Sequence, residues 1–499
     1  MTGYLESHRR QLVLVICCLS VLLVGIDMTA VNVALPSIGR DFHTSTSSLS
    51  WIIDAYALVL ATLLMLSSSM ADRFGRKLVF RIGLGTFVLG SALCAVAPSL
   101  GWLIAFRALQ GVGGSMLNPV AMAIIANVFR DPAERARAIG VWAGITGLSL
   151  AIGPIVGGAL VGSSLGWRWI FLINVPIGLA AIAISTKIVP ESKAAKPRKV
   201  DFGGQTLIAT LLGTLVFGVI EGPHLGWGSP AIIGVLAVSL AALLGFLAYE
   251  PRVSEPLLDL RFFRSIPFSA ANLIAVFSFA SLSAFLYLNS IYLQEARGYS
   301  PLHTGLLMAP LAVVSVIWGP RNGKLLGKLG ARVPLIIAGI AFTAAAVILT
   351  RVTVTTPIAW LLIAYALMGL GNSSVGAPIT HTAVAGMPPD QAAVAAGVSS
   401  TTRQIGQTIG VAVAGVTLAS AAALTHAHLA TATHTGWILN VGYGLAILAT
   451  GLIGTTAHAK RTAEKAVPTN TAAARSAEPG LTPADSAEPG LTPGLPARR

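Results

Sequence analysis

The sequence predicts an all-α polytopic membrane protein made of two related halves. Of its 499 residues, 54% are hydrophobic and only 10% are charged, whereas soluble domains carry about 25% charged residues. A water-soluble fold of this length could not cover its surface with so few charges. Apolar runs of about twenty residues, the length of a membrane-spanning helix, and an internal repeat support the same fold class.

The apolar runs give the expected helices in order. The start His8-Arg9-Arg10 before an apolar run resembles a signal peptide, but no small-x-small cleavage site follows. We therefore expect residues 1–11 to be a cytoplasmic N-terminus and the first run to be an uncleaved helix. The fourteen runs lie near 12–35, 49–71, 78–97, 101–128, 138–162, 169–188, 203–221, 231–249, 268–292, 303–320, 333–350, 357–378, 395–420 and 436–456.

The basic residues predict the orientation of these helices. Fourteen is even, so both termini share one side of the membrane. With the N-terminus inside, 27 of the 33 Lys and Arg lie on the cytoplasmic side, as the positive-inside rule requires. The net charge of +14 therefore reports topology, and we expect no nucleic-acid partner.

An internal repeat divides the chain. Residues Ala108–Ser115 match Ala366–Ser373 at an offset of 258, and Ala138–Val141 match Ala395–Val398 at an offset of 257. Helices one to six therefore correspond to helices nine to fourteen. Two such halves, with the binding site between them, are a recurring transporter architecture. The predicted units are a six-helix bundle over 12–188, a linker over 189–267 with two inserted helices (203–221 and 231–249), and a second bundle over 268–456.

The last residues have a different composition. Residues 457–499 are rich in Ala, Pro, Thr and Glu and contain SAEPGLTP twice. Such a segment buries too little apolar area to order itself, so it predicts a disordered cytoplasmic tail. The three cysteines, Cys17, Cys18 and Cys94, lie within apolar runs and do not indicate a disulfide framework.

Two carboxylates inside apolar runs are the main functional signal. Asp27 lies in the middle of the first run, and Asp54 lies near the outer start of the second. An acid in a membrane helix usually faces the bundle interior or a water-filled path, and burial favours the protonated form of a carboxylic acid. The pattern predicts a proton-coupled transporter with Asp27 as the proton site. We expect water to reach Asp54, which would attract cationic substrates, pair with an arginine or cap its helix.

Arg107, in the run 101–128, is the expected partner of these acids. A membrane-embedded arginine needs a counter-charge or water, and Asp27 and Asp54 are the acids available. The alternative is that Arg107 snorkels from the helix end to the membrane interface.

Three motifs carry a family resemblance. The second loop reads Asp72-Arg73-Phe74-Gly75-Arg76-Lys77, the fourth helix contains Arg107-x-x-Gln110-Gly111, and the fifth contains Gly147-x5-Gly153-Pro154-x2-Gly157-Gly158. These resemble signatures of the major facilitator superfamily, although that family usually has Gly where this chain has Ser68. Stretches at 27–36, 51–56 and 166–176 narrow the resemblance to the 14-helix drug:proton antiporters. It covers about residues 10–455 and implies the major facilitator fold.

The resemblance implies a role for each motif. Asp72, Arg73, Gly75 and Arg76 would latch the two halves when the outward-open state forms. Arg107 would take part in proton coupling. The glycines and Pro154 of the fifth helix would form a bent, tightly packed helix that limits proton leak and favours exchange. The alternatives from the residues alone are an ordinary basic loop and a generic packing face of small residues.

Together these observations predict proton-driven export of an amphipathic drug or antibiotic across a bacterial cytoplasmic membrane by a monomer. The expected partners are the substrate, protons and lipid, with no cofactor, metal or catalytic residue. One alternative within the same fold is a proton-coupled importer of a small polar metabolite. Another is an integral membrane enzyme, although the sequence contains no nucleophile elbow, metal-ligand cluster or phosphate loop.

Overall fold

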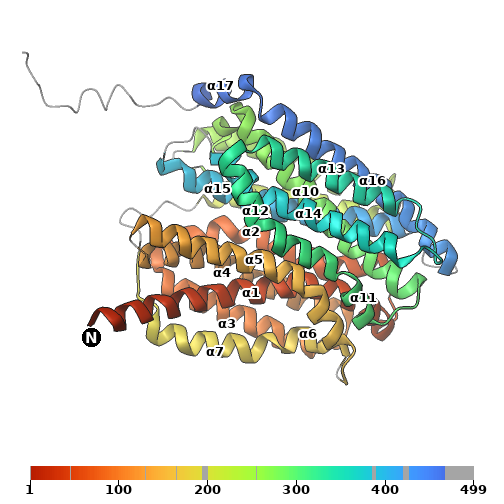
Figure 1. The fold of residues 1–499 in the computed structure, drawn as a ribbon. Helices are drawn as coiled ribbons and strands as arrows, with labels where there is room; N and C mark the ends of the chain where they lie inside the picture. The colour runs from red at the N-terminus through yellow and green to blue at the C-terminus, as the bar shows by residue number, and fades with distance from the viewer. Residues whose placement is uncertain are drawn as a thin grey trace, which may run out of the picture.

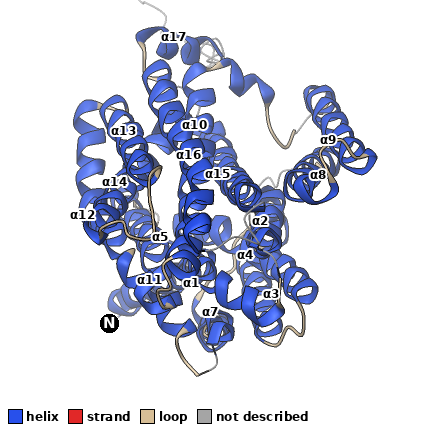
Figure 2. Ribbon diagram, turned by 90° about the vertical axis from the view of Figure 1, so that its right-hand side faces the viewer, coloured by secondary structure: helices blue, strands red, loops and turns tan. Residues whose placement is uncertain are grey.

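The computed structural model describes residues 2–44, 46–129, 131–164, 166–193, 201–253, 256–384, 389–419 and 426–466. In these ranges all regular structure is helical (Figures 1 and 2). This confirms the predicted all-α class. Twelve helices in the described ranges are long and apolar enough to cross a membrane.

The first half comprises helices α1 to α7, and the second comprises α10 to α16. The long helices of the first half are α1 (Thr2–Phe42), α2 (Thr46–Phe74), α3 (Arg76–Ala95), α4 (Leu100–Val128), α5 (Pro132–Val161) and α7 (Asn174–Ile188). Those of the second half are α10 (Ile266–Ile291), α12 (Ala309–Leu329), α13 (Arg332–Leu349), α14 (Ile358–Val384), α15 (Pro389–Ala419) and α16 (His426–Gly454).

Two predicted helices are divided. The sixth consists of the 3-10 turn η1 (Gly166–Arg168), α6 (Trp169–Leu172) and α7, and the tenth consists of α11 (Pro301–Leu307) and α12. Pro176 lies four residues after the end of α6, and Pro310 lies three residues after the end of α11. Proline has no N–H to donate to the carbonyl four residues earlier, which explains both breaks.

The start and the tail of the chain also differ from the prediction. Helix α1 begins at Thr2, so most of the predicted N-terminal segment 1–11 is helical. Residues Ala457–Ala466 form α17, although a disordered tail was predicted from residue 457. The hydroxyl of Thr456 accepts from the backbone N–H of Ala459 at 3.1 Å and caps this helix. The rest of the tail lies outside the described residues.

The inserted helices α8 (Phe202–Leu225) and α9 (Pro230–Tyr249) form a pair outside the two bundles (Figure 2). Helix α8 packs on α2 of the first half and on α15 of the second. Val216, Ile220 and Ala412 form a small buried cluster at this contact. The insertion therefore covers one of the seams between the halves.

The halves meet where α1 ends and α2 begins, which we call the closed end. There Arg40 binds Glu295 at 2.7 Å, and Gln294 donates to the carbonyl of Val33 at 2.8 Å. Figure 1 shows the two bundles in contact near α11 and diverging toward the end that carries the N-terminus. The molecule thus has one end closed by direct contacts between the halves.

Candidate functional site: a buried ion pair in the first half

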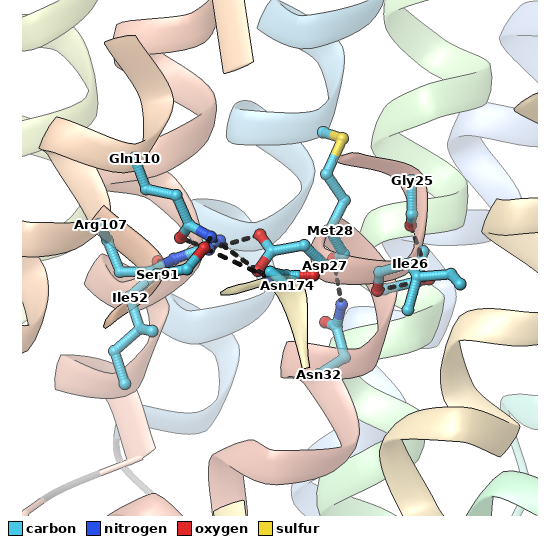
Figure 3. Close-up of polar contacts among 11 residues, drawn as sticks. Gly25, Ile26, Asp27, Met28, Asn32, Ile52, Ser91, Arg107, Gln110 and Asn174 are labelled. Atoms are coloured by element: carbon cyan, nitrogen blue, oxygen red, sulfur yellow. Dashed lines mark hydrogen bonds and ion pairs between the residues drawn. The ribbon is translucent and has the colours of Figure 1, made fainter. Parts of the chain in front are cut away.

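Asp27 of α1 and Arg107 of α4 form an ion pair inside the first bundle. Nη1 of Arg107 donates to Oδ2 of Asp27 at 2.6 Å (Figure 3). The two residues are 1% and 0% exposed. The arginine therefore does not reach the interface, and the snorkelling alternative is wrong.

Three polar side chains complete the surroundings of Asp27. Nε2 of Gln110 donates to Oδ1 of Asp27 at 2.9 Å and to Oγ of Ser91 at 2.8 Å. Nδ2 of Asn174 donates to the same aspartate oxygen at 3.2 Å. These residues come from α4, α3 and α7, so four helices meet at one carboxylate (Figure 3). The ion pair thus belongs to a polar network that spans the bundle.

The sequence did not assign these three residues to the site. Gln110 and Asn174 appeared only as letters of family-like stretches, and Ser91 was not singled out. Isolated serines are common in apolar helices because the hydroxyl can bond to the preceding turn, so Ser91 carried no signal of its own. Asn174 offered a weak signal, since it is a strongly polar residue at the start of an apolar segment.

Arg107 has further acceptors besides Asp27. Its Nη1 also donates to Oε1 of Gln110 at 2.6 Å, and its Nε donates to the carbonyl of Ile52 at 2.9 Å. Its guanidinium lies 4.3 Å from the ring centroid of Tyr56, a distance at which the aromatic face attracts a cation. Arg107 therefore keeps favourable contacts whether or not Asp27 carries a charge.

Asp54 lies elsewhere, at the contact between the halves. It is 0% exposed, so the expected access of water is wrong for this conformation. It acts electrostatically on Tyr287 of α10, and Ser50, one turn earlier on α2, faces Gly415 of α15. Neither carboxylate oxygen has a hydrogen-bond partner among the described residues, and Asp54 forms no ion pair with an arginine there. The structure therefore does not bring Asp54 to Arg107.

The loop between α2 and α3 is fastened to its own half. Oδ1 of Asp72 accepts from Nη2 of Arg76 at 3.0 Å. Gly75 has φ 119°, a backbone conformation that favours glycine, and a Cβ there would lie 2.6 Å from Oε1 of Glu191. Arg73 is exposed and lies against Phe74. The latch across the halves, expected in another conformation, stays a prediction.

Small residues of α5 bring three helices into contact. A Cβ at Gly153 would collide with Oγ1 of Thr29, and one at Gly157 would lie 2.8 Å from Cα of Ala30. Both partners lie on α1, within one turn of Asp27. Gly158 faces the other way and contacts the carbonyl of Pro301 at α11. Gly147, the first glycine of the motif, lies outside the residues whose side chains are described.

Pro154 extends this contact, because its carbonyl meets Gly305 of α11. Helix α5 therefore touches α1 on one side and the second half on the other. No group of three or more His, Cys, Asp or Glu within the described ranges could hold a metal ion.

Comparison with known proteins identifies the family. A profile of the Major Facilitator Superfamily matches residues 17–411. This chain belongs to the Major Facilitator Superfamily. It is therefore a multi-pass membrane protein of a family of transporters and not of enzymes.

Several superfamily members similar to this chain bear the names of resistance proteins. Multidrug resistance protein Stp of Mycobacterium tuberculosis is 35% identical over 83% of this chain and 77% of its own length. The tetracenomycin C resistance and export protein of Streptomyces glaucescens is 34% identical over 80% and 74%. The puromycin resistance protein pur8 of Streptomyces alboniger is 35% identical over 81% of each chain.

A solved structure shows the same fold. The crystal structure of a bacterial homologue of the human lysosomal transporter Spinster, in an inward-facing and occupied conformation, aligns with a TM-score of 0.63. It is 18% identical and covers 92% of this chain and 99% of its own. At this identity the similarity establishes the superfamily fold alone.

The second half of this superfamily member replaces the ion pair with aromatic rings. The offset of 258 between helices four and twelve relates Arg107 to Tyr365, and the same offset applied to helix one pairs Asp27 with Phe285. The rings of Phe285 and Tyr365 pack edge to face with centroids 5.3 Å apart, and Trp437 lies 6.0 Å from Phe285. The repeat thus conserves the contact between two helices and places the charges in the first half alone.

Proposed function

We propose that this protein exports amphipathic drugs or antibiotics across a bacterial cytoplasmic membrane in exchange for protons, by alternating access. The observation that carries the proposal is the buried network of Asp27, Arg107 and Gln110. Its acid is excluded from water and held by three donors from two other helices, α4 and α7. The resistance and export proteins similar to this chain support the substrate class and the direction.

Protonation of Asp27 weakens the interaction between α1 and α4. The ionised carboxylate attracts Arg107 of α4, and a charged hydrogen bond of this kind is stronger than a neutral one. When Asp27 takes a proton, this attraction is lost. Arg107 keeps Gln110 and the carbonyl of Ile52 as acceptors. Proton binding thus loosens α1 from α4 without leaving the arginine unpaired.

Helix α1 can pass this change to the second half through two contacts. Thr29 and Ala30, next to Asp27, pack against the glycines of α5, which also contacts α11. At the closed end the carbonyl of Val33 accepts from Gln294 of the second half. A shift of α1 therefore alters both contacts, and alternating access requires such a change at the interface between halves.

Asp54 is proposed to favour cationic substrates. Its two oxygens are buried at the contact between the halves without a hydrogen-bond partner among the described side chains. A carboxylate so placed gains free energy from a cation or a proton when the halves separate. The role therefore depends on the charge of the substrate.

The proposed topology has fourteen spans. Helices α5 and α15 contain 30 and 31 residues and occupy equivalent places in the two halves. We propose that they join the twelve apolar helices as membrane spans, with both termini in the cytoplasm because the basic residues gather there. On this reading the closed end faces outward, Asp72, Arg73, Gly75 and Arg76 control switching from the cytoplasmic side, and the protein works as a monomer.

Transport by everted membrane vesicles tests the proposal. Vesicles containing the full chain are placed in a medium that contains ethidium. The interior of the vesicles is then made acidic relative to the medium. The expected result is accumulation of the dye that collapses when a proton ionophore is added. Each charge moved through 100 mV supplies about 2.3 kcal/mol, so one proton can support a gradient of tens-fold. Accumulation that survives the ionophore would contradict proton coupling, and dye movement in the reverse direction would indicate an importer.

A further inference from the structure

Two buried carboxylates lie at one end of the inserted helices, far along the chain from Asp27. Asp201 precedes the first residue of α8, and Glu250 follows the last residue of α9. They are 8% and 1% exposed. Since aspartate and glutamate are rarely buried unless paired, these two need an explanation.

Backbone amides satisfy three of their four oxygens. Oδ1 of Asp201 accepts from the N–H of Gly204 at 2.8 Å, and Oδ2 accepts from that of Leu257 at 3.3 Å. Oε2 of Glu250 accepts from the N–H of Leu258 at 3.4 Å. Oε1 of Glu250 is buried and has no hydrogen-bond partner. One oxygen of the pair is therefore left open.

The open oxygen faces the other carboxylate. A Cβ built on Gly204 would lie 2.5 Å from Oε1 of Glu250 and 2.5 Å from Oδ2 of Asp201. Oε1 of Glu250 and Oδ2 of Asp201 therefore lie at most twice 2.5 Å apart. Two ionised carboxylates this close in a buried site repel each other, and normally one of them stays protonated.

The surroundings supply no compensating cation within the described ranges. The groups that act on Glu250 from nearby, Asp201 and Asp259, are both acidic. The other polar group near Asp201 is the uncharged hydroxyl of Tyr249. The described basic residues nearest to Glu250 along the chain are engaged elsewhere, because Arg252 donates to the carbonyl of Ala248 and Arg261 binds Asp259 at 2.8 Å.

We propose that Asp201 and Glu250 form a proton-binding site. In this site Oε1 of Glu250 is protonated and its O–H donates a hydrogen bond to Oδ2 of Asp201. A proton fits better than a metal ion, because Ca²⁺ and Mg²⁺ need six or more oxygen ligands. Here the amides of Gly204, Leu257 and Leu258 already occupy three of the four carboxylate oxygens.

The protonated pair acts as a clamp on the connection to the second half. The amides it holds belong to Leu257 and Leu258, whose side chains line a cavity of about 70 Å³. The other walls come from α2, α8, α9, η3 (Leu260–Arg264) and α15, which include residues of both halves and of the inserted pair. Loss of the proton would leave two negative carboxylates that repel each other. This repulsion would weaken the hydrogen bonds to the amides of Leu257 and Leu258. The site is separate from the network around Asp27, so it does not depend on the proposed exchange mechanism.

Thermal unfolding of the full chain in detergent tests the clamp. Because the folded protein holds a proton that an exposed glutamate has lost at neutral pH, folding takes up a proton. The unfolding equilibrium constant should then rise by up to about tenfold for each pH unit between the titration of an exposed glutamate and that of the folded site, and level off above the latter. We expect the melting temperature of the wild type to fall as the pH is raised from about 6 to about 8.

Glu250→Gln isolates this effect, since its amide can still donate to Asp201 but cannot titrate. It should melt like the wild type at the lower pH and above it at the higher pH. Glu250→Ala should melt lower at both, since it removes the hydrogen bonds of the clamp. The matched control is Glu134→Gln, an exposed glutamate paired with Arg10, which should keep the wild-type dependence on pH.

Infrared difference spectra of the wild type and Glu250→Gln give an independent readout. A carbonyl band of a protonated carboxylic acid should be present at neutral pH and absent from the variant. An unchanged spectrum, or a variant that keeps the wild-type fall in melting temperature, would overturn the proposal. Stabilisation of the wild type by added Na⁺ or Ca²⁺ at high pH would also overturn it, because a cation would then occupy the site.

Discussion

Replacing Asp27 by Asn should abolish pH-gradient-driven export while leaving a folded but less stable protein. The substitution removes a charge that Arg107, Gln110 and Asn174 now hold through hydrogen bonds of 2.6, 2.9 and 3.2 Å. The neutral amide has nearly the same size, so the volume of the bundle interior is kept. What changes is the charge balance of the site.

The cost in stability follows from the burial of Arg107. Removing one partner of a buried ion pair usually costs about 3–5 kcal/mol. In this protein the guanidinium retains the carbonyl of Ile52, Oε1 of Gln110 and the face of Tyr56. We therefore expect the lower end, about 3 kcal/mol, or roughly 150-fold in the ratio of folded to unfolded protein.

A double variant separates charge balance from transport. In Asp27→Asn combined with Arg107→Gln no buried charge is left alone, so much of the lost stability should return. Export should remain absent, because the proton-binding group is still missing. Melting in detergent and ethidium accumulation in everted vesicles measure the two properties on the same preparations. Export at the wild-type rate by Asp27→Asn would refute the assignment of the proton to this residue.

Three further substitutions test other parts of the proposal. Asp54→Asn should reduce export of cationic dyes at least tenfold and that of a neutral antibiotic only a few-fold; equal losses would remove Asp54 from selectivity. Asp72→Asn should slow turnover and leave the affinity measured by equilibrium binding within a few-fold, and a large loss of binding would count against a switching role. Gly157→Val should lower the melting temperature and block transport, because its side chain would enter Ala30 and overpacking costs about 1–3 kcal/mol. Gly144→Val, on the same helix with open space around it, should behave like the wild type.

The sequence predicted the helices better than it predicted their contacts. Apolar runs marked most helix positions to within a few residues, because a membrane span is defined by local composition. The runs fell short at both ends of α1, at the end of α12 and at the start of α16, and they missed α17, because these segments contain too many polar residues for an apolar window. They also joined the segments on either side of Ile173 and Met308, which the tertiary structure separates.

The candidate site was predicted in part. Asp27 and Arg107 stood out because an ionisable residue within an apolar run is costly and therefore conspicuous. Ser91 was missed because its contribution comes from its position opposite Gln110, to which it bonds at 2.8 Å. The exposure of Asp54 was misjudged, since depth along a helix does not tell which face meets the second half.

The sequence by itself determined that this chain is a helical membrane protein with an internal repeat and that two acids lie within its apolar runs. These properties follow from composition and local spacing, which set the free energy of placing each segment in lipid. Only the tertiary structure decided that Arg107 pairs with Asp27, 80 positions away, and leaves Asp54 at the contact between the halves. It also decided that the equivalent place in the second half is filled by Phe285 and Tyr365. An ion pair depends on the distance between charges in space, and packing of four helices sets that distance.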